Sequence, residues 1–252
     1  MSQEKRIELI KQLLEERQEL STKDIMQEFG ISQDTARRDI VLLAKRGEVR
    51  RTHGGILPLD FGRSVPNFQS RLARFTKQKT QIALAAATYF KPHHVYFVDS
   101  STILLKTCQN INMPLTIVTH SLDNCMALAE HNKVRVKVLS GTLNHENRYF
   151  YSNLAIEELQ NVVFDTAFIA ASGIDENGAY LLDQDDAQIV GMAVKRARKV
   201  ILVAEHQKFV NKSYYRICPL DKISLFITDQ APTPAQRAMF APETKIIVTE
   251  EA

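Results

Sequence analysis

Seven short apolar runs, separated by helix-length stretches, constrain the fold of most of this chain. In order, they are VYFV (95–98), LTIVT (115–119), VRVKVL (134–139), TAFIAA (166–171), KVILVA (199–204), LFIT (225–228) and KIIVT (245–249). Residues 80–90 and 187–198 are examples of the intervening helical stretches. Strands that are apolar along their whole length and joined by helices are typical of a parallel sheet covered on both faces. We therefore expect a mostly parallel α/β domain over residues 77–252.

The first 57 residues show a different pattern, which predicts three short helices. An amphipathic helix is expected over 4–17, a second over 22–29 and a third over 33–46. Gly30 is placed to end the second helix, and Ser32 is placed to cap the third. Two helices joined by a tight turn that contains glycine, with a supporting helix before them, are typical of the helix-turn-helix motif.

A short β-ribbon is predicted directly after the third helix, in EVRRTHGGILPL (48–59). Val49 and Ile56 flank a turn at Gly54 and Gly55, as the two strands of a wing would. The N-terminal domain is therefore predicted to be a winged helix-turn-helix over 1–57. The stretch that follows contains Pro, Gly and Phe without a clear period, and we assign 58–76 to a linker.

Positive charge is concentrated around the third helix and the wing. The whole chain has a formal net charge of only +3. Residues 32–79, however, contain eleven Lys or Arg against four acids, whereas residues 2–31 contain five against seven. A local basic patch in a nearly neutral protein is the electrostatic signature of double-stranded DNA binding.

The start of the third helix, SQDTARRDI, carries the residues that we expect to contact DNA. They are Ser32, Gln33, Asp34, Thr35, Arg37 and Arg38, joined by Arg50, Arg51 and His53 of the wing. Gln33 and one of the two helix arginines suit base edges in the major groove, and hydroxyl groups and wing side chains suit the phosphate backbone. Asp39 suits an internal salt bridge instead, because phosphate would repel it. The alternative for the arginine pair is a solvated charged helix face.

Several classes of protein are disfavoured by the sequence. The three cysteines, Cys108, Cys125 and Cys218, are odd in number and show no CxxC spacing, so neither a disulfide framework nor a zinc site is indicated. We expect no metal and no cofactor. The charged N-terminus does not suit a signal peptide, and no apolar run has the length of a membrane span. We therefore expect a cytoplasmic protein with no membrane partner.

Polar residues follow the first three predicted strands and suggest a small-molecule site. They are Asp99, Ser100, Ser101 and Thr102 after the first strand, Ser121 after the second, and Gly141 and Thr142 after the third. Ligands of open α/β sheets bind at the carboxyl ends of the strands, where hydroxyl and backbone N–H groups can hold an anion. The alternative is that these Ser and Thr residues only cap helices.

The sequence resembles the DeoR family of bacterial transcriptional repressors over nearly its whole length. The resemblance is carried by SQDTARRD and RTHGG in the N-terminal part and by SGIDENG and VAEHQKF in the C-terminal part. It implies a C-terminal domain related to ribose-5-phosphate isomerase, which binds a phosphorylated sugar or a related metabolite and thereby alters DNA affinity. It also implies a repressor of carbohydrate metabolism. A homodimer or tetramer is expected, because helix-turn-helix proteins read paired half-sites.

The resemblance adds Asp185 and Lys208 to the expected effector site, with Lys208 as the best cation for a phosphate. Three departures from the family pattern bear on that site. Ser101 replaces a Gly, Asn144 stands where an Arg is usual, and Val190 stands where a Lys is usual. A phosphate would then have fewer positive partners than in other members.

Three functions remain open on the sequence. The first is a repressor gated by a metabolite. The second is a DNA-binding protein whose C-terminal domain only oligomerises. The third is an enzyme of the sugar-phosphate isomerase type, with Asp99, Asp185 or Asp186 as a general base. Because the Lys expected at position 190 is missing, we favour a regulator without enzymatic activity.

Overall fold

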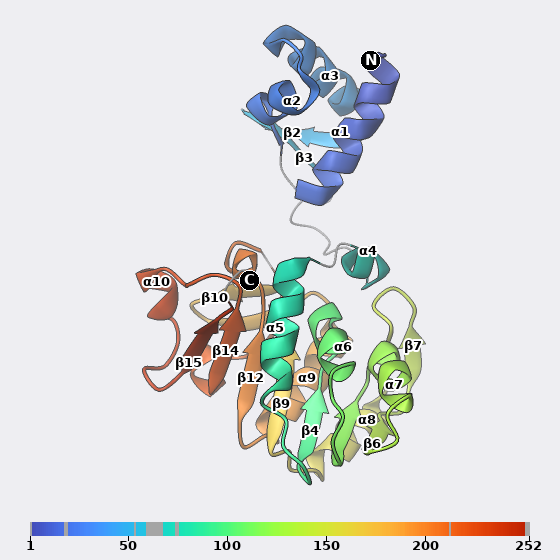
Figure 1. Ribbon diagram of the computed structural model, residues 1–252, viewed down its shortest axis with the longest axis vertical. Helices are drawn as coiled ribbons and strands as arrows, with labels where there is room; N and C mark the ends of the chain where they lie inside the picture. The colour runs from blue at the N-terminus through green and yellow to red at the C-terminus, as the bar shows by residue number, and fades with distance from the viewer. Residues whose placement is uncertain are drawn as a thin grey trace. The chain divides into compact units, whose positions relative to one another are not determined.

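The computed structural model describes residues 2–17, 20–52, 54–58, 68–73, 76–211 and 213–249 (Figure 1). The chain divides into two compact units, Met1–Ser64 and Val65–Ala252, which we describe separately. None of the described helices is both long and apolar enough to cross a membrane.

The N-terminal unit is a winged helix-turn-helix, as the sequence predicts. Its helices are α1 (Gln3–Arg17), α2 (Thr22–Phe29) and α3 (Gln33–Lys45). Its antiparallel sheet has the order β1-β3-β2, from β1 (Leu20–Ser21), β2 (Val49–Arg51) and β3 (Gly55–Pro58). Gly30 ends α2 with a left-handed φ of 59°, and the Ser32 side chain caps α3. The turn between the two helices therefore has the residues that its backbone needs.

A close backbone approach joins the wing to the rest of this unit. A Cβ atom added at Gly55 would lie 1.9 Å from the carbonyl oxygen of Leu20, so only glycine fits this position. The carbonyl oxygen of Gly54 accepts hydrogen bonds from the backbone N–H (2.8 Å) and the hydroxyl (3.0 Å) of Thr22. The wing is thus fixed to the start of α2.

The C-terminal unit is built on a seven-stranded parallel sheet with the order β15-β14-β12-β9-β4-β5-β6. Its strands are β4 (Val95–Val98), β5 (Leu115–Thr119), β6 (Val134–Val138), β9 (Thr166–Ala170), β12 (Val200–Val203), β14 (Leu225–Thr228) and β15 (Lys245–Val248). All seven predicted runs form these strands, and every pairing between them is parallel. The predicted α/β fold is confirmed.

Helices cover both faces of this sheet (Figure 1). One face packs against α5 (Lys77–Ala87), α6 (Thr102–Cys108) and α7 (Leu122–Ala129) through a core that includes Ile82, Leu104 and Leu128. The other face packs against α8 (Asn153–Gln160) and α9 (Gln184–Lys195) through a core that includes Leu159 and Ile189. Strands buried from both sides must be apolar along their whole length, which explains the sequence pattern.

Several smaller elements were not expected from the sequence. Strands β7 (Thr142–Asn144) and β8 (Tyr149–Tyr151) form a hairpin, and β10 (Gly173–Asp175), β11 (Gly178–Leu181) and β13 (Tyr215–Cys218) form an antiparallel sheet. The short helices are α4 (Phe68–Ala73), η1 (His206–Phe209), η2 (Leu220–Lys222) and α10 (Pro234–Arg237). Helix α4 lies within the range assigned to the linker, and its Phe68 is fully buried.

Candidate functional site

The start of α3 presents the side chains that the sequence assigns to DNA contact. Ser32, Gln33, Asp34, Arg37 and Arg38 are exposed, and Thr35 is half-buried. The hydroxyl groups of Ser32 and Thr35 lie 3.0 Å apart, so one donates to the other, and the second keeps its own O–H for a phosphate. The two arginines point to solvent from the first turns of the helix.

Asp39, on the same helix, is completely buried and fixes α3 to α1. Its Oδ2 accepts a hydrogen bond of 2.6 Å from Nε of Arg6, and its Oδ1 accepts one of 2.9 Å from Nε2 of Gln3. The predicted internal salt bridge is confirmed. The interaction sets the orientation of the helix that carries Arg37 and Arg38.

The wing contributes one described DNA-contact candidate with an exposed side chain, Arg51. Arg50 lies in β2, but its side chain lies outside the part of the chain that the structure describes. His53 lies outside the described residues altogether. These three assignments remain predictions.

A pocket lies in the C-terminal unit at the carboxyl ends of β4, β9 and β12. It encloses about 730 Å³ of space between the atoms, which includes open solvent at its mouth. Its polar and charged lining residues are Arg71, Lys79, Ser100, Ser101, Thr102, Asn147, Ser172, Asp183, Asp186, Glu205 and Lys208. The predicted Ser100, Ser101, Thr102 and Lys208 are therefore brought together.

Three basic side chains from three separate elements line this pocket: Arg71 of α4, Lys79 of α5 and Lys208 of η1. Arg71 Nη1 donates a hydrogen bond of 3.1 Å to Oδ1 of Asn147. Burial lowers the pKa of Lys208 to about 8, partly offset by Glu205, while Lys79 and Arg71 lower it further. Lys208 is therefore mostly protonated below about pH 8, and a bound anion would raise its pKa.

The expectation that a phosphate has fewer positive partners here than in other family members stays a prediction, but the pocket holds more basic side chains than Lys208 alone. Sequence reasoning relied on Lys208 and missed Arg71 and Lys79, which line the same pocket. Both lie far along the chain from Lys208, and Arg71 lies in the predicted linker. Their only signal in the sequence was the basic excess of residues 32–79, which we assigned to DNA.

Asp99 holds the loop after β4, which contains Ser100, Ser101 and Thr102, in position through hydrogen bonds. It is 1% exposed, and its carboxylate accepts hydrogen bonds from the backbone N–H groups of Ser100 and Ala170. The loop after β4 is thereby tied to the end of β9. Ser101 Oγ accepts a hydrogen bond of 3.0 Å from Leu104 N, so this side chain caps α6.

Asp99 also belongs to a buried cluster with His120 and Asp186. Nε2 of His120 lies 2.7 Å from Oδ1 of Asp186 and 3.8 Å from Oδ1 of Asp99. Burial and the negative charge of Asp186 raise the pKa of Asp99 to about 7, although His120 opposes the shift. Sequence reasoning missed His120, whose only signal was its place directly after a predicted strand.

The same cluster has the side-chain types that bind divalent metals, two carboxylates and an imidazole. Its three donor atoms lie within 4.8 Å of one another. Asp99 already accepts two backbone hydrogen bonds, and His120 is bonded to Asp186. As it stands, the cluster is a hydrogen-bonded network that positions Asp186 on the pocket wall.

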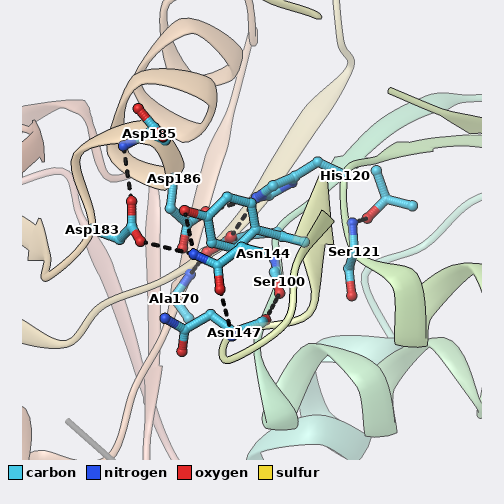
Figure 2. A network of polar contacts seen from close by, with 12 residues as sticks. Ser100, His120, Ser121, Asn144, Asn147, Ala170, Asp183, Asp185 and Asp186 are labelled. Atoms are coloured by element: carbon cyan, nitrogen blue, oxygen red, sulfur yellow. Dashed lines mark hydrogen bonds and ion pairs between the residues drawn. The ribbon is translucent and has the colours of Figure 1, made fainter. Parts of the chain in front are cut away.

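A second polar network joins the β7–β8 hairpin to the pocket (Figure 2). Asn144 Nδ2 donates to Oδ2 of Asp183 (3.2 Å), and Asn144 Oδ1 accepts from Asn147 N (3.0 Å). The Ser100 hydroxyl donates to the carbonyl oxygen of Asn147 at 3.3 Å. Hairpin, α9 and the loop after β4 are thus held in a fixed arrangement around the pocket.

Comparison with known proteins identifies both units. The model for the DeoR C terminal sensor domain matches residues 74–230, and the model for the DeoR-like helix-turn-helix domain matches residues 6–60. The chain belongs to the DeoR family. It is therefore a DNA-binding transcriptional regulator with a sensor domain, and not an enzyme.

Relatives within this family match almost end to end. The chain is 29% identical to the HTH-type transcriptional repressor GlcR of Bacillus subtilis (strain 168), over 93% of this chain and 92% of that protein. It is 28% identical to a putative aga operon transcriptional repressor of Escherichia coli O157:H7, over 89% and 86%. Among solved structures, ribose 5-phosphate isomerase A from Methanocaldococcus jannaschii is 14% identical, with a TM-score of 0.39 over 53% of this chain and 54% of that one.

Five residues that we expected at the effector site do not line the pocket of this DeoR-family chain: Asp99, Ser121, Gly141, Thr142 and Asp185. Asp99 is buried and holds the loop after β4 through its hydrogen bonds. Ser121 is fully buried and caps α7, and Asp185 is exposed on the first turn of α9. A Cβ atom at Gly141 would lie 2.1 Å from Tyr151 O, and Thr142 pairs with Tyr151 in the hairpin. Apart from Asp99, these residues follow β5 and β6 or lie on the first turn of α9, whereas the pocket is formed by the ends of β4, β9 and β12.

The departures from the family pattern have structural explanations. Asn144, in place of an Arg, holds Asp183 and the turn at Asn147. Val190, in place of a Lys, lies on α9 and is fully buried in the core that this helix forms with the sheet. Neither residue lines the pocket.

Proposed function

We propose that this protein is a repressor of a carbohydrate-metabolism operon whose DNA affinity is controlled by a phosphorylated sugar or related metabolite. The observation that carries the proposal is the convergence of Arg71, Lys79 and Lys208 on one pocket of the sensor domain. Several basic side chains around a small concave site suit a doubly charged phosphate group. The acceptor side chains of Asp183 and Asp186 suit the hydroxyl groups of a sugar.

The DNA-binding side of the proposal rests on α3 and the wing. Gln33 and Arg37 or Arg38 would read base edges, and Ser32, Thr35 and the wing arginines would contact phosphates. Helix-turn-helix domains bind paired half-sites about one helical turn apart, which favours a homodimer or tetramer. The two relatives named above are both called repressors. We place the protein in the cytoplasm, where chromosomal DNA and phosphorylated metabolites meet.

A thermal-shift panel of phosphorylated sugars and polyols tests the sensor. A ligand at about 100 times its dissociation constant stabilises the folded state by about 2.7 kcal/mol. For a domain of this size, we expect the midpoint of unfolding to rise by about 5–10 °C with at least one compound. Lys208→Met should abolish the rise, because it removes a positive charge from the pocket while keeping most of the side-chain stem.

The matched control is Lys195→Met, which removes the same charge from an exposed position at the end of α9. It should respond to the ligand as the wild-type chain does. An equal rise in the Lys208 variant would contradict the assignment of the pocket. A flat panel over well-folded protein would instead support a regulator whose C-terminal domain only oligomerises.

A further inference from the structure

Glu205 is a buried acidic residue that lines the pocket beside its basic side chains. It is 6% exposed, lies two residues after the end of β12 and lines the pocket together with Lys208. Its Oε2 lies 3.7 Å from Nζ of Lys79, and both side chains are almost fully enclosed. Its charge also acts on Lys208, whose positive form it favours. A carboxylate in this place interacts with the very groups that would hold an anionic ligand.

The other two acidic lining residues have different partners. Asp183 caps α9 and accepts a hydrogen bond from Asn144. Asp186 is hydrogen-bonded to His120. Glu205 is paired instead with a basic lining residue, Lys79. Glu205 is therefore the acidic residue whose partner an incoming anion would also bind.

We propose that the Glu205 carboxylate competes with the anionic group of the effector for Lys79. A bound phosphate would replace the carboxylate as the partner of Lys79. The inference rests on the proposed function, since it needs an anion in this pocket. Glu205 would then lower the affinity of the protein for its effector. It also supplies a contact that differs between the unbound and bound states, which a ligand-controlled switch requires.

Competition by charge predicts how the affinity for anions changes when Glu205 is neutralised. The lining holds three basic side chains, Arg71, Lys79 and Lys208, and three acidic ones, of which Glu205 is the one paired with a basic lining residue. Neutralising Glu205 removes one negative charge that an anion meets, so every anion should bind more tightly. Because the interaction scales with ligand charge, a dianion should gain about twice the free energy that a monoanion gains. A residue that merely held Lys79 in position would give the opposite result, because its loss would weaken binding.

The test compares methyl phosphate with methyl sulfate by calorimetry at pH 7.5, on the full-length chain and its Glu205→Gln variant. The two probes have nearly the same shape, but the phosphate ester is mostly a dianion at this pH and the sulfate ester is a monoanion. We expect Glu205→Gln to tighten methyl phosphate about tenfold, equal to about 1.4 kcal/mol. Methyl sulfate should tighten only about threefold.

Two further variants make the result specific. Glu130→Gln removes an acid from an exposed position at the end of α7 and should leave both affinities unchanged. In a Lys79→Met background, Glu205→Gln should lose most of its effect, because the competition acts through Lys79. If Glu205→Gln fails to fold, Glu205→Asp draws the carboxylate back and should tighten methyl phosphate to a smaller extent.

The possible failures are distinguishable. If the wild-type chain binds methyl phosphate and Glu205→Gln binds it equally or more weakly, the inference is wrong and the proposed function stands. If both probes tighten by the same factor, the competition is not electrostatic and the inference is also wrong. If no variant binds either probe while the chain remains folded, the inference and the phosphate pocket fall together.

Discussion

An Asp39→Ala substitution is expected to lower the free energy of unfolding of the N-terminal unit by about 3–5 kcal/mol. The change removes the partner of Arg6, whose side chain is only 10% exposed, and leaves its guanidinium group buried without a counter-charge. It also removes the acceptor of Gln3. Hydrogen exchange measured by mass spectrometry on the full-length chain would place the loss of protection in α1, α2 and α3, with the sensor domain unchanged.

Two variants separate this effect from a general loss of negative charge. Asp34→Ala removes an exposed acid from the first turn of the same helix, where it interacts with the helix dipole, and should cost less than about 1 kcal/mol. Arg6→Met combined with Asp39→Leu removes both buried charges and should recover most of the stability. Equal effects of Asp39→Ala and Asp34→Ala would show that the buried pair does not hold α3 to α1.

Arg37→Ala and Arg38→Ala are expected to produce the largest losses of DNA affinity. An arginine that reads a base edge should cost about 1–3 kcal/mol when removed and should relax specificity at one position of the site. An arginine that contacts phosphate should weaken all sequences equally and reduce the salt dependence of binding. Fluorescence anisotropy with DNA from the chain's own upstream region and with random DNA, at several salt concentrations, would assign each role.

Lys45→Ala is the matched control for this pair of variants. It removes one positive charge from the other end of α3, away from the expected DNA contact, and leaves the exposed face of the first turns intact. We expect less than a threefold loss of affinity from it. If Lys45→Ala and Arg37→Ala weaken binding equally, and Arg38→Ala does the same, the arginine pair belongs to a solvated surface.

The sequence predicts those parts of the fold that have a strong local signal. The seven strands of the sheet are buried on both faces, so each is an uninterrupted apolar run. The helix-turn-helix is marked by Ser21, Gly30 and Ser32, whose roles are set by local backbone geometry. The hairpin β7–β8 and the sheet of β10, β11 and β13 have strands of only three or four residues. Such strands have too few positions for a period to appear, and tertiary contacts decide them.

The effector pocket could be predicted only in part, because tertiary structure assembles it. Ser100, Ser101 and Thr102 follow a strand directly, so the rule for open α/β sheets finds them. Arg71 and Lys79 come from helices whose position over the sheet no local pattern encodes. Ser121 follows the same rule as Ser100, but its strand, β5, lies farther from the pocket than β9 and β12 do in the strand order. Strand order is the missing information.

If the pocket controls the DNA-binding domain, a bound effector must change the affinity for DNA. The affinity of the full-length chain for its upstream DNA should be measured with and without the compound that gives the thermal shift. We expect the compound to change the affinity by about 5–150-fold, and to have no effect on the Lys208→Met variant. A compound that binds the wild-type chain at saturation and leaves its DNA affinity unchanged would contradict the account.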